Sequence, residues 1–323
     1  MKVTAHIATG LVLALTTLLA GCGKKTANTS ANIPTAKNRI EFCADSAAAY
    51  VKAQCDFGPR VPNTTAHTLC GDWLLNQLNR RGATVTAQEA TLTTFDGTTL
   101  NARNIIAQFN PDSTYRILLT AHWDCRPWAD SDPDPAKHHL PVMGANDGAS
   151  GVGVLLEIAR LIALQNPSIG IDIIFFDAED WGTNNDDDSW ALGTQYWAQH
   201  QHTQNYAPAY AILLDMVGAP GASFQREYFS MAFAPGVVNN VWATAHAAGY
   251  GNFFKNSDGA AITDDHLFVN KAGIKCIDIV DYRSDDDGGF FEHWHTTTDT
   301  FDNIDPATLK AVGQTLTNLI FQQ

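Results

Sequence analysis

The sequence lacks several features that define common classes of protein. No two cysteines have a Cys-x-x-Cys spacing, which argues against a thiolate metal site. No Gly-x-Ser-x-Gly segment is present, so a serine nucleophile on a strand-to-helix turn is not indicated. Basic residues are scarce: 20 lysines and arginines against 34 acidic residues give a net charge of −14. This balance disfavours binding to nucleic acid or to anionic lipid by charge, because both need a basic face.

A long hydrophobic run is also missing. The apolar segment at residues 10–20 is too short to span a bilayer as a helix. It ends in Leu19-Ala20-Gly21-Cys22, which resembles the lipobox of bacterial lipoproteins. We therefore expect a signal peptide at residues 1–21, lipid on Cys22 and a flexible polar tether at residues 22–38. The expected location is the bacterial periplasm, and Gly23 after the lipidated cysteine favours the outer membrane.

Five cysteines follow the predicted lipidation site: Cys43, Cys55, Cys70, Cys125 and Cys276. Export to an oxidising compartment permits disulfides, but an odd number leaves at least one thiol without a partner in the same chain. We interpret these cysteines as structural.

Apolar segments alternate with amphipathic ones through residues 39–323. Their periodicity predicts helices at residues 46–54, 65–81, up to 165, 192–200, 237–248, 265–272 and from 306. It predicts strands at residues 85–94, 104–109, 115–121, 171–176, 210–216, 228–233 and 275–281. The second and third of these strands flank a turn and predict a hairpin. The pattern indicates one three-layer α/β/α domain with a mixed, mainly parallel, twisted central sheet.

Acidic residues and histidines recur where the predicted strands end. The most apolar strand, residues 171–176, runs directly into Asp177, Glu179 and Asp180. Open α/β sheets place ligand sites at the carboxyl ends of such strands. Because two adjacent carboxylates repel each other, we expect a shared proton or a cation to hold them. Further groups of this kind are His122, Asp124, Asp147, Asp215, Asp264, Asp265, His266, Asp278, Asp281 and His295.

Oxygen and imidazole donors without a thiolate suit a catalytic zinc ion with one open coordination position. Of the adjacent Glu179 and Asp180, one would bind the metal and the other would move protons. Taken singly, Asp147 also fits a helix cap, Asp215 a buried hydrogen-bonded carboxylate and His295 a surface histidine. The metal prediction therefore depends on their joint occurrence.

From residue 42 onward the chain resembles the zinc aminopeptidase-like α/β clan, and within it the bacterial glutaminyl cyclases. The motifs that carry this resemblance are His122-Trp-Asp124, Asn146-Asp147-Gly-Ala-Ser, Phe175-Phe-Asp-Ala-Glu-Asp180, Asp215-Met-Val-Gly-Ala-Pro220, Asp264-Asp-His266 and Trp294-His-Thr296. The motifs that begin at Asp215 and Asp264 are the more specific to cyclases.

The resemblance implies a zinc-dependent glutaminyl-peptide cyclotransferase, which converts the N-terminal glutaminyl residues of peptides and proteins to pyroglutamate and releases ammonia. It implies one zinc ion per chain. The implied ligands are Asp147, Asp180 and His295, and the implied general acid/base is Glu179. No nucleophile from the protein is needed, because the substrate's own α-amine attacks its γ-amide.

The resemblance also implies residues around the substrate. Asp264 and Asp215 would form a carboxylate pair at the reacting amide nitrogen. The implied pocket residues are Trp294, with Trp181 as a second candidate, and His122 and Asp278 nearby. The loops at residues 126–141 and 184–188 are expected to shape the pocket rim. We expect a monomer that contacts the membrane only through its lipid.

Two positions depart from the animal glutaminyl cyclases. Asp180 stands where those enzymes have Glu, so the metal would sit closer to the backbone. Asp278 stands where they have His, and an acidic residue there can change the pKa of its carboxylate neighbours.

Two alternatives remain at this point. A di-zinc aminopeptidase would use His122, Asp147, Glu179, Asp180, Asp215 and His295, and all six are present. Asp264-Asp265-His266 favours the cyclase, because peptide hydrolysis gives no role to a further carboxylate facing Asp215. The other alternative is a non-catalytic surface lipoprotein that keeps the fold for binding. The presence of Glu179 and His295 weighs against it.

Overall fold

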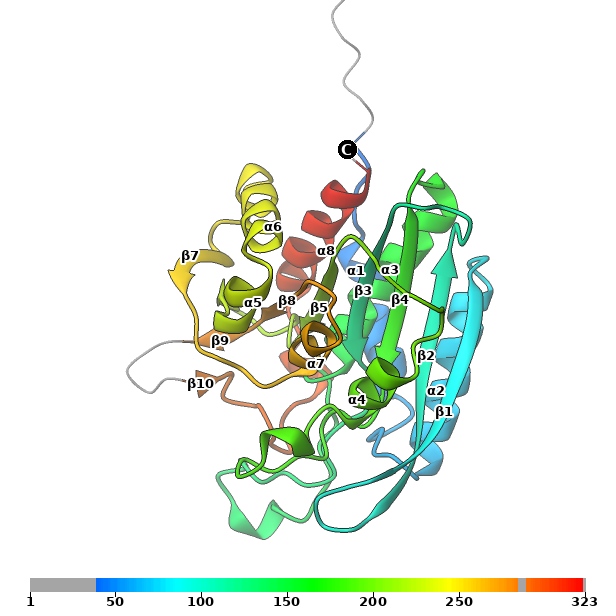
Figure 1. Ribbon diagram of the computed structural model, residues 1–323. Helices are drawn as coiled ribbons and strands as arrows, with labels where there is room; N and C mark the ends of the chain where they lie inside the picture. Colours follow the sequence, from blue (N-terminus) through cyan, green and yellow to red (C-terminus); the bar gives the residue numbers. More distant parts are fainter. Residues whose placement is uncertain (1–38, 284–288, 322–323) are drawn as a thin grey trace, which may run out of the picture. The chain divides into compact units, whose positions relative to one another are not determined.

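A mixed sheet of six strands organises the fold (Figure 1). The computed structural model describes residues 39–283 and 289–321, so the predicted signal peptide, lipidated Cys22 and tether lie outside the described residues. The strand order is β1-β2-β4-β3-β5-β8. The strands are β1 (Thr84–Thr93), β2 (Thr99–Phe109), β3 (Arg116–His122), β4 (Gly170–Phe176), β5 (Ala211–Asp215) and β8 (Cys276–Val280). From β4 to β8 neighbouring strands are parallel, whereas β1 and β2 add antiparallel pairs at one edge.

Strand β4 lies between β2 and β3, so the predicted hairpin of residues 104–109 and 115–121 is wrong. All seven residues of β4 are buried. A strand that is apolar on both faces gains most from a central position with neighbours on both sides, and the short turn between β2 and β3 does not outweigh this gain. The hairpin is formed instead by β1 and β2, whose ladder pairs Thr84 with Gln108 and Thr93 with Thr99.

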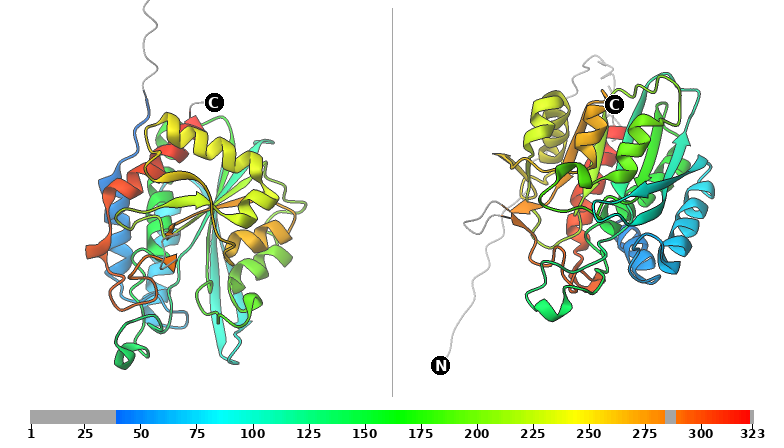
Figure 2. Two further views of the ribbon diagram at one scale, coloured as in Figure 1. Left: turned by 90° about the vertical axis from the view of Figure 1, so that its left-hand side faces the viewer. Right: turned by 60° about the horizontal axis from the view of Figure 1, so that its bottom comes forward.

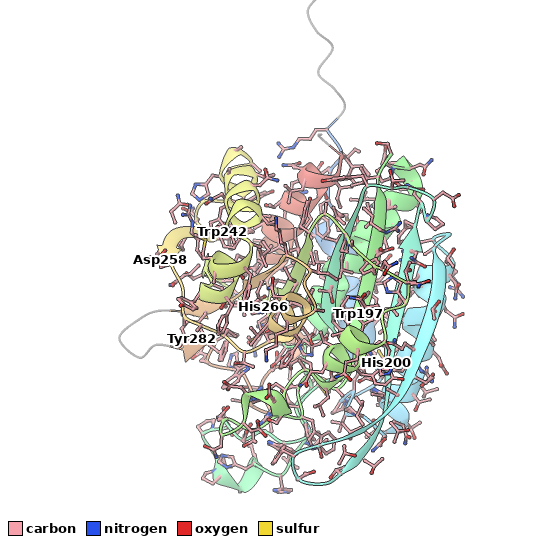
Figure 3. The ribbon with its side chains drawn as sticks, in the orientation of Figure 1. Trp197, His200, Trp242, Asp258, His266 and Tyr282 are labelled. Atoms are coloured by element: carbon pink, nitrogen blue, oxygen red, sulfur yellow. The ribbon has the colours of Figure 1, made fainter. Side chains whose placement is uncertain are left out.

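Helices cover both faces of the sheet, and the left view of Figure 2 shows the sheet edge-on, with helices on either side of it. One layer contains α4 (Leu192–Gln199) and α7 (Asp265–Lys271), with Trp197 of α4 and His266 of α7 over the same face (Figure 3). The other contains α1 (Ala44–Cys55), α2 (Thr65–Asn79), α3 (Ala149–Gln165) and α8 (Pro306–Phe321). The predicted three-layer α/β/α class is confirmed.

Alternate residues of the central strands enter two separate cores, as the period of a strand requires. Leu119 and Ile173 pack with α1 and α3. Leu118 and Ile174 point the other way, into the core that contains Trp197. The side chains of the sheet thus hold the two helical layers in fixed positions.

The segment at residues 228–233 is a helix, α5 (Tyr228–Phe233), and not the predicted strand. The reason is its cap: the Glu227 carboxylate accepts hydrogen bonds from the N–H groups of Phe229, at 2.9 Å, and Ser230, at 2.6 Å. The next helix, α6 (Pro235–Ala247), is where the periodicity predicts it. Two short strand pairs lie beside these helices: β6 (Phe224–Arg226) with β7 (Phe254–Asp258), and β9 (Tyr282–Arg283) with β10 (Gly289–Phe290).

The five cysteines after residue 38 are all free thiols. Burial raises the pKa of Cys70 to about 12, and it raises the pKa of Cys276 well above its usual value. The thiols of Cys70 and Cys276 therefore remain protonated and behave as small apolar side chains. Within residues 39–283 and 289–321, no helix has the length and apolar character needed to cross a membrane.

Candidate active site

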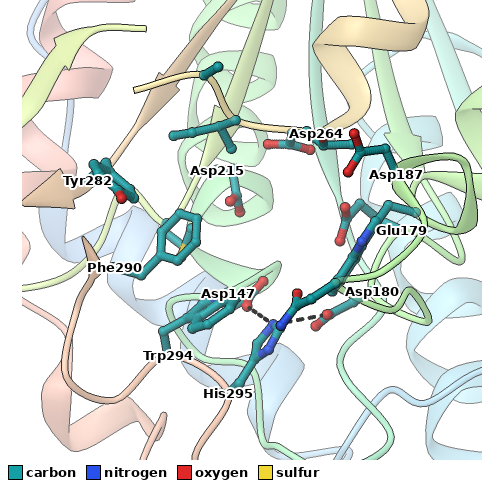
Figure 4. Close-up of a pocket in the computed structure, with 16 residues that line it drawn as sticks. Asp147, Glu179, Asp180, Asp187, Asp215, Asp264, Tyr282, Phe290, Trp294 and His295 are labelled. Atoms are coloured by element: carbon teal, nitrogen blue, oxygen red, sulfur yellow. Dashed lines mark ion pairs between the residues drawn. The ribbon is translucent and has the colours of Figure 1, made fainter. Parts of the chain in front are cut away.

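Four ends of neighbouring elements meet at one edge of the sheet. Strand β3 ends at His122, β4 runs into Glu179 and Asp180, β5 ends at Asp215, and Asp147 lies just before α3. Because β3, β4 and β5 are adjacent and parallel, their carboxyl ends bring these side chains together. All of them except His122 line a cavity of about 280 Å³. Figure 4 shows Asp147, Glu179, Asp180, Asp215, Asp264, Trp294 and His295 around this cavity.

Asp147, Asp180 and His295 form a compact group in the cavity wall. One donor atom from each lies within 4.8 Å of the other two. The Nε2 atom of His295 is 3.1 Å from Oδ1 of Asp180 and 3.5 Å from Oδ2 of Asp147 (Figure 4). All three side chains are buried, and Oδ2 of Asp180 has no hydrogen-bond partner among the described residues. Burial and the charge of Asp147 both raise the pKa of Asp180, which shows the cost of placing two carboxylates here without a cation.

This donor set fits zinc. Two carboxylate oxygens and one imidazole nitrogen match the ligand types of catalytic zinc sites, which keep a further position open to water or substrate. The three residues face a cavity, so the open position would point to the space where a substrate binds. The unpartnered Asp180 oxygen is the observation that a cation would satisfy.

Two buried carboxylates outside the cavity hold the backbone of these residues. Asp124 accepts hydrogen bonds from the N–H groups of Glu179 and Asp180, each at 3.2 Å. Asp299 accepts from the N–H groups of Asn146, at 2.8 Å, and Asp147, at 3.1 Å. Sequence reasoning missed Asp299, because nothing in its local pattern distinguishes it from any other acidic residue in a loop.

Three residues beside the cavity have left-handed backbone conformations without being glycine. Their φ angles are 53° at Ala178, 49° at Met216 and 54° at His295. Each such residue costs roughly 1–3 kcal/mol and persists only where its surroundings hold it. Ala178 precedes Glu179, and Met216 follows Asp215. The strain is therefore concentrated where the chain turns from a strand end into the cavity wall.

Glu179 lines the cavity beside Asp180, and only 8% of the residue is exposed. Burial raises its pKa well above the usual value. The positive charge of His122 opposes this change, and the carboxylates of Asp264 and Asp180 add to it. A carboxyl whose pKa is shifted upward in this way is suited to proton transfer near neutral pH.

His122 is buried behind the cavity wall and lines no part of the cavity itself. Its Nε2 atom lies 3.0 Å from Oδ1 of Asp147 and 3.1 Å from Oδ1 of Asp215. Burial would lower the pKa of His122, but hydrogen bonds to Asp124, Asp147 and Asp215 raise it well above its usual value. Donor atoms of His122, Asp147 and Asp215 also lie within 4.8 Å of one another, so Asp147 belongs to two groups that can hold a metal.

Asp278 is fully buried behind Asp264, which lines the cavity. Neither Asp278 oxygen has a hydrogen-bond donor among the described residues. Burial raises the pKa of Asp278 well above its usual value, and the charges of Asp264, Asp215 and Glu227 raise it further. Burial and these charges therefore favour the neutral, protonated form of Asp278. His266 also lies beside Asp278, with its Nδ1 atom 3.6 Å from Oδ2 of Asp278. The other ring nitrogen of His266, Nε2, pairs with Glu227 at 3.0 Å.

Aromatic side chains line one wall of the cavity. The ring of Trp294 stacks on His295 with centroids 3.6 Å apart, and Trp190, Tyr282 and Phe290 also line the cavity. The prediction that Trp181 contributes to the pocket is corrected, since it packs on Trp128 instead, with centroids 5.6 Å apart. Trp190 takes its place because Gly182 leaves space for the indole, and a Cβ at residue 182 would lie 2.0 Å from that ring.

The two loops expected at the rim behave differently. Asn184 and Asp187 from the loop at residues 184–188 line the cavity. No residue of the loop at 126–141 does so, and its contacts are with the chain around His295 and Asp180.

Comparisons with known proteins agree with this architecture. The model of peptidase family M28 matches residues 104–320. A Zn-dependent exopeptidase from Parabacteroides distasonis ATCC 8503 is 53% identical, with a TM-score of 0.86 over 88% of this chain and 100% of that one. A glutaminyl cyclase from Bacteroides thetaiotaomicron, solved with N-acetylhistamine, is 52% identical, with the same TM-score and the same coverage of both chains.

A more distant similarity extends to an animal enzyme. Glutaminyl-peptide cyclotransferase of Bos taurus is 24% identical over 246 residues, which are 66% of this chain and 64% of the bovine one. The chain therefore spans slightly less than two thirds of that relative. The family model covers most of this chain, and solved bacterial structures match it over their whole length. The chain belongs to peptidase family M28, within the branch of that family that contains the bacterial glutaminyl cyclases.

Proposed function

We propose that this protein is a zinc-dependent glutaminyl-peptide cyclotransferase. The observation that supports this function most directly is the combination of two features in one cavity. A zinc-type donor set of Asp147, Asp180 and His295 lies on one side, and the buried carboxyl of Asp264 lies on the other. The substrates are peptides and proteins with an N-terminal glutamine.

The cavity suits a single side chain. Its volume of about 280 Å³ lies just below the range of about 300–1,000 Å³ for small-ligand pockets. Trp294, Tyr282 and Phe290 supply an apolar wall for the methylene groups of a glutamine side chain. The carboxyls of Glu179, Asp215 and Asp264 line other parts of the cavity, where the amine and amide groups of the substrate need polar partners.

The reaction forms a bond between the α-nitrogen of the substrate and its own γ-carbon, and it breaks the bond from that carbon to the amide nitrogen. Zinc held by Asp147, Asp180 and His295 supplies electrophilic polarisation of the γ-carbonyl oxygen. The α-amine attacks as the neutral free base. Glu179 takes one proton from this nitrogen as the new bond forms and returns it to the departing NH2 group, which leaves as ammonia. The cavity would hold the α-amine close to the γ-amide and in the right orientation. This orientation removes a large part of the activation barrier for ring closure.

The carboxyls of Asp264 and Asp215 receive hydrogen bonds from the amide nitrogen and then from the leaving ammonia. Burial raises the pKa of Asp215 to about 7, and the charges of Asp264 and Asp147 contribute to this shift. Asp278 is buried behind Asp264, and burial raises its pKa and favours its neutral form. His122 holds Asp215 and Asp147 from outside the cavity.

An experiment on residues 23–323 tests this function. The purified protein, with its zinc content measured, is incubated with a Gln-initiated dipeptide and with a Leu-initiated peptide. We expect ammonia and the lactam from the first substrate, no free leucine from the second, and about one zinc ion per chain.

A specific observation supports a second candidate, a di-zinc aminopeptidase. His122, Asp147 and Asp215 form a second metal-competent group that shares Asp147 with the first. In that case the same experiment would release free leucine at about two zinc ions per chain. That result would reject the cyclotransferase and make His122 and Asp215 metal ligands.

We also propose that the protein is exported to the periplasm, loses residues 1–21 and is anchored to the outer membrane through lipid on Cys22. The support is the lipobox-like Leu19-Ala20-Gly21-Cys22 and the polar segment that follows. In a bacterial host, we expect the protein in the membrane fraction with incorporated fatty acid, and the Cys22→Ala variant without that label. Label on the variant would reject this site of lipidation.

A further inference from the structure

The loop at residues 126–141 contacts two of the proposed zinc ligands, Asp180 and His295, and contributes nothing to the cavity wall. Its first residue, Arg126, is 2% exposed and lines no part of the cavity, so it is not positioned to touch a substrate. A buried arginine with no place in the proposed chemistry needs another explanation. We propose that Arg126 is a positioning residue that fixes two of the three proposed zinc ligands, Asp180 and His295.

The contact with Asp180 is direct. One terminal nitrogen of Arg126, Nη1, donates to the main-chain carbonyl oxygen of Asp180 at 3.1 Å and to the Gly182 carbonyl at 3.3 Å. It also lies 3.4 Å from Oδ1 of Asp180, the oxygen that faces His295. The guanidinium therefore holds both the backbone and the carboxylate of this ligand.

The contact with His295 is made through Asp130. Arg126 holds the Asp130 carboxylate in a bidentate pair, with N–O distances of 2.8 and 2.6 Å. Oδ1 of Asp130 lies 3.4 Å from Nδ1 of His295, and the opposite nitrogen, Nε2, faces Asp147 and Asp180. A carboxylate beside the outer nitrogen of a metal-binding histidine fixes the orientation of the ring.

Two further contacts fix the chain and the ring at His295. The N–H of Ser131 donates to the carbonyl of His295 at 3.1 Å, and His295 itself has a φ of 54°. Such a strained residue needs surrounding contacts to keep its conformation. The Arg126 guanidinium lies between the rings of Trp128 and Trp190, 5.0 and 4.9 Å from their centroids, and Trp190 in turn stacks on His295. Arg126 thus reaches His295 by two routes.

The direction of the change in zinc affinity distinguishes a positioning role of Arg126 from an effect of its charge alone. A positive guanidinium near a cation site opposes metal binding, so its removal would strengthen binding if charge alone mattered. If Arg126 positions the ligands, its removal weakens binding, by about 10–100-fold for contacts of this kind. Arg126→Lys keeps the charge but loses the two parallel N–H donors that bind Asp130. It also loses the planar guanidinium that packs against Trp128 and Trp190. It should therefore also weaken binding.

The inference rests on the zinc site of the proposed function, so the experiment measures zinc affinity directly. The metal-free parent, Arg126→Gln and Arg126→Lys are titrated with zinc in competition with a chromophoric chelator. Near-UV circular dichroism and thermal unfolding check that each protein is folded. The matched control is Arg116→Gln, which breaks a buried bidentate pair with Asp172, at 2.7 Å for both contacts, at the opposite end of β3.

We expect both Arg126 variants to bind zinc about 10–100-fold more weakly than the parent, with Arg116→Gln unchanged. If Arg126→Gln does not fold, Asp130→Ala takes its place, because this side chain is 37% exposed and its loss removes the carboxylate that links Arg126 to His295. Unchanged or tighter binding by the variants, or equal weakening by Arg116→Gln, would overturn the inference. If the parent itself binds no zinc, the proposed function falls together with the inference.

Discussion

Replacing Glu179 by glutamine should reduce turnover of a Gln-initiated peptide by about 10²–10⁴-fold, the range for loss of a general acid/base. The amide keeps the size of the side chain but can neither accept nor return a proton at neutral pH. The N–H of residue 179 still donates to Asp124, so the backbone that carries Asp180 should not move. The ammonia released at saturating substrate gives kcat, and the zinc content should remain about one per chain.

A matched control for this variant is Asp187→Asn, which makes the same change of charge at the exposed rim of the same cavity. It should retain activity within a few-fold of the parent, because nothing requires Asp187 to exchange a proton. More than a tenth of the parental activity in Glu179→Gln would remove Glu179 from its role. Loss of zinc in that variant would mean that Glu179 binds the metal as well.

The hydrophobic period of the chain is sufficient to predict the layers of this fold, but it is not sufficient to predict every neighbour in the sheet. Strand β4 is apolar at almost every position, and its central place follows from burial on both faces. The turn between β2 and β3 does not predict that β4 lies between these two strands. Which strands are neighbours depends on the packing of the whole sheet. The helix α5 was missed for a local reason, the cap that the Glu227 side chain provides.

Residues that touch the cavity were easier to predict than residues that support it. Asp147, Asp180 and Asp215 occur at strand ends or helix starts, where the order of elements already brings them together. The supporting residues lie in loops: Arg126 contacts Asp180, Asp130 contacts His295 and Asp299 contacts Asp147. These pairs are far apart in the sequence, so the sequence pattern does not predict their contacts. The place of Trp190 on the cavity wall was also beyond sequence reasoning, because it depends on the space that Gly182 leaves for the indole.

Replacing Asp264 by asparagine should reduce kcat by about 10²-fold, because a charge-assisted hydrogen bond is worth roughly 1.5–3 kcal/mol. In the proposed reaction this carboxylate receives hydrogen bonds from the amide nitrogen and from the leaving ammonia, and an amide side chain is a weaker acceptor for both. The fold should survive, because the asparagine oxygen can still accept the N–H of Asp265, which begins α7, as the Asp264 oxygen does at 2.5 Å.

The informative comparison is Asp278→Asn, the same substitution one layer further from the cavity. Burial and the charges of Asp264 and Asp215 raise the pKa of Asp278 and favour its neutral form. An asparagine amide is also neutral and has nearly the same size, so this variant should keep kcat within about threefold of the parent, equivalent to less than 1 kcal/mol. Equal losses in the two variants would mean that the buried acidic cluster has only a structural role. A large loss in Asp264→Asn alone would instead assign Asp264 to the reacting atoms and explain how this chain functions with an acidic residue at position 278.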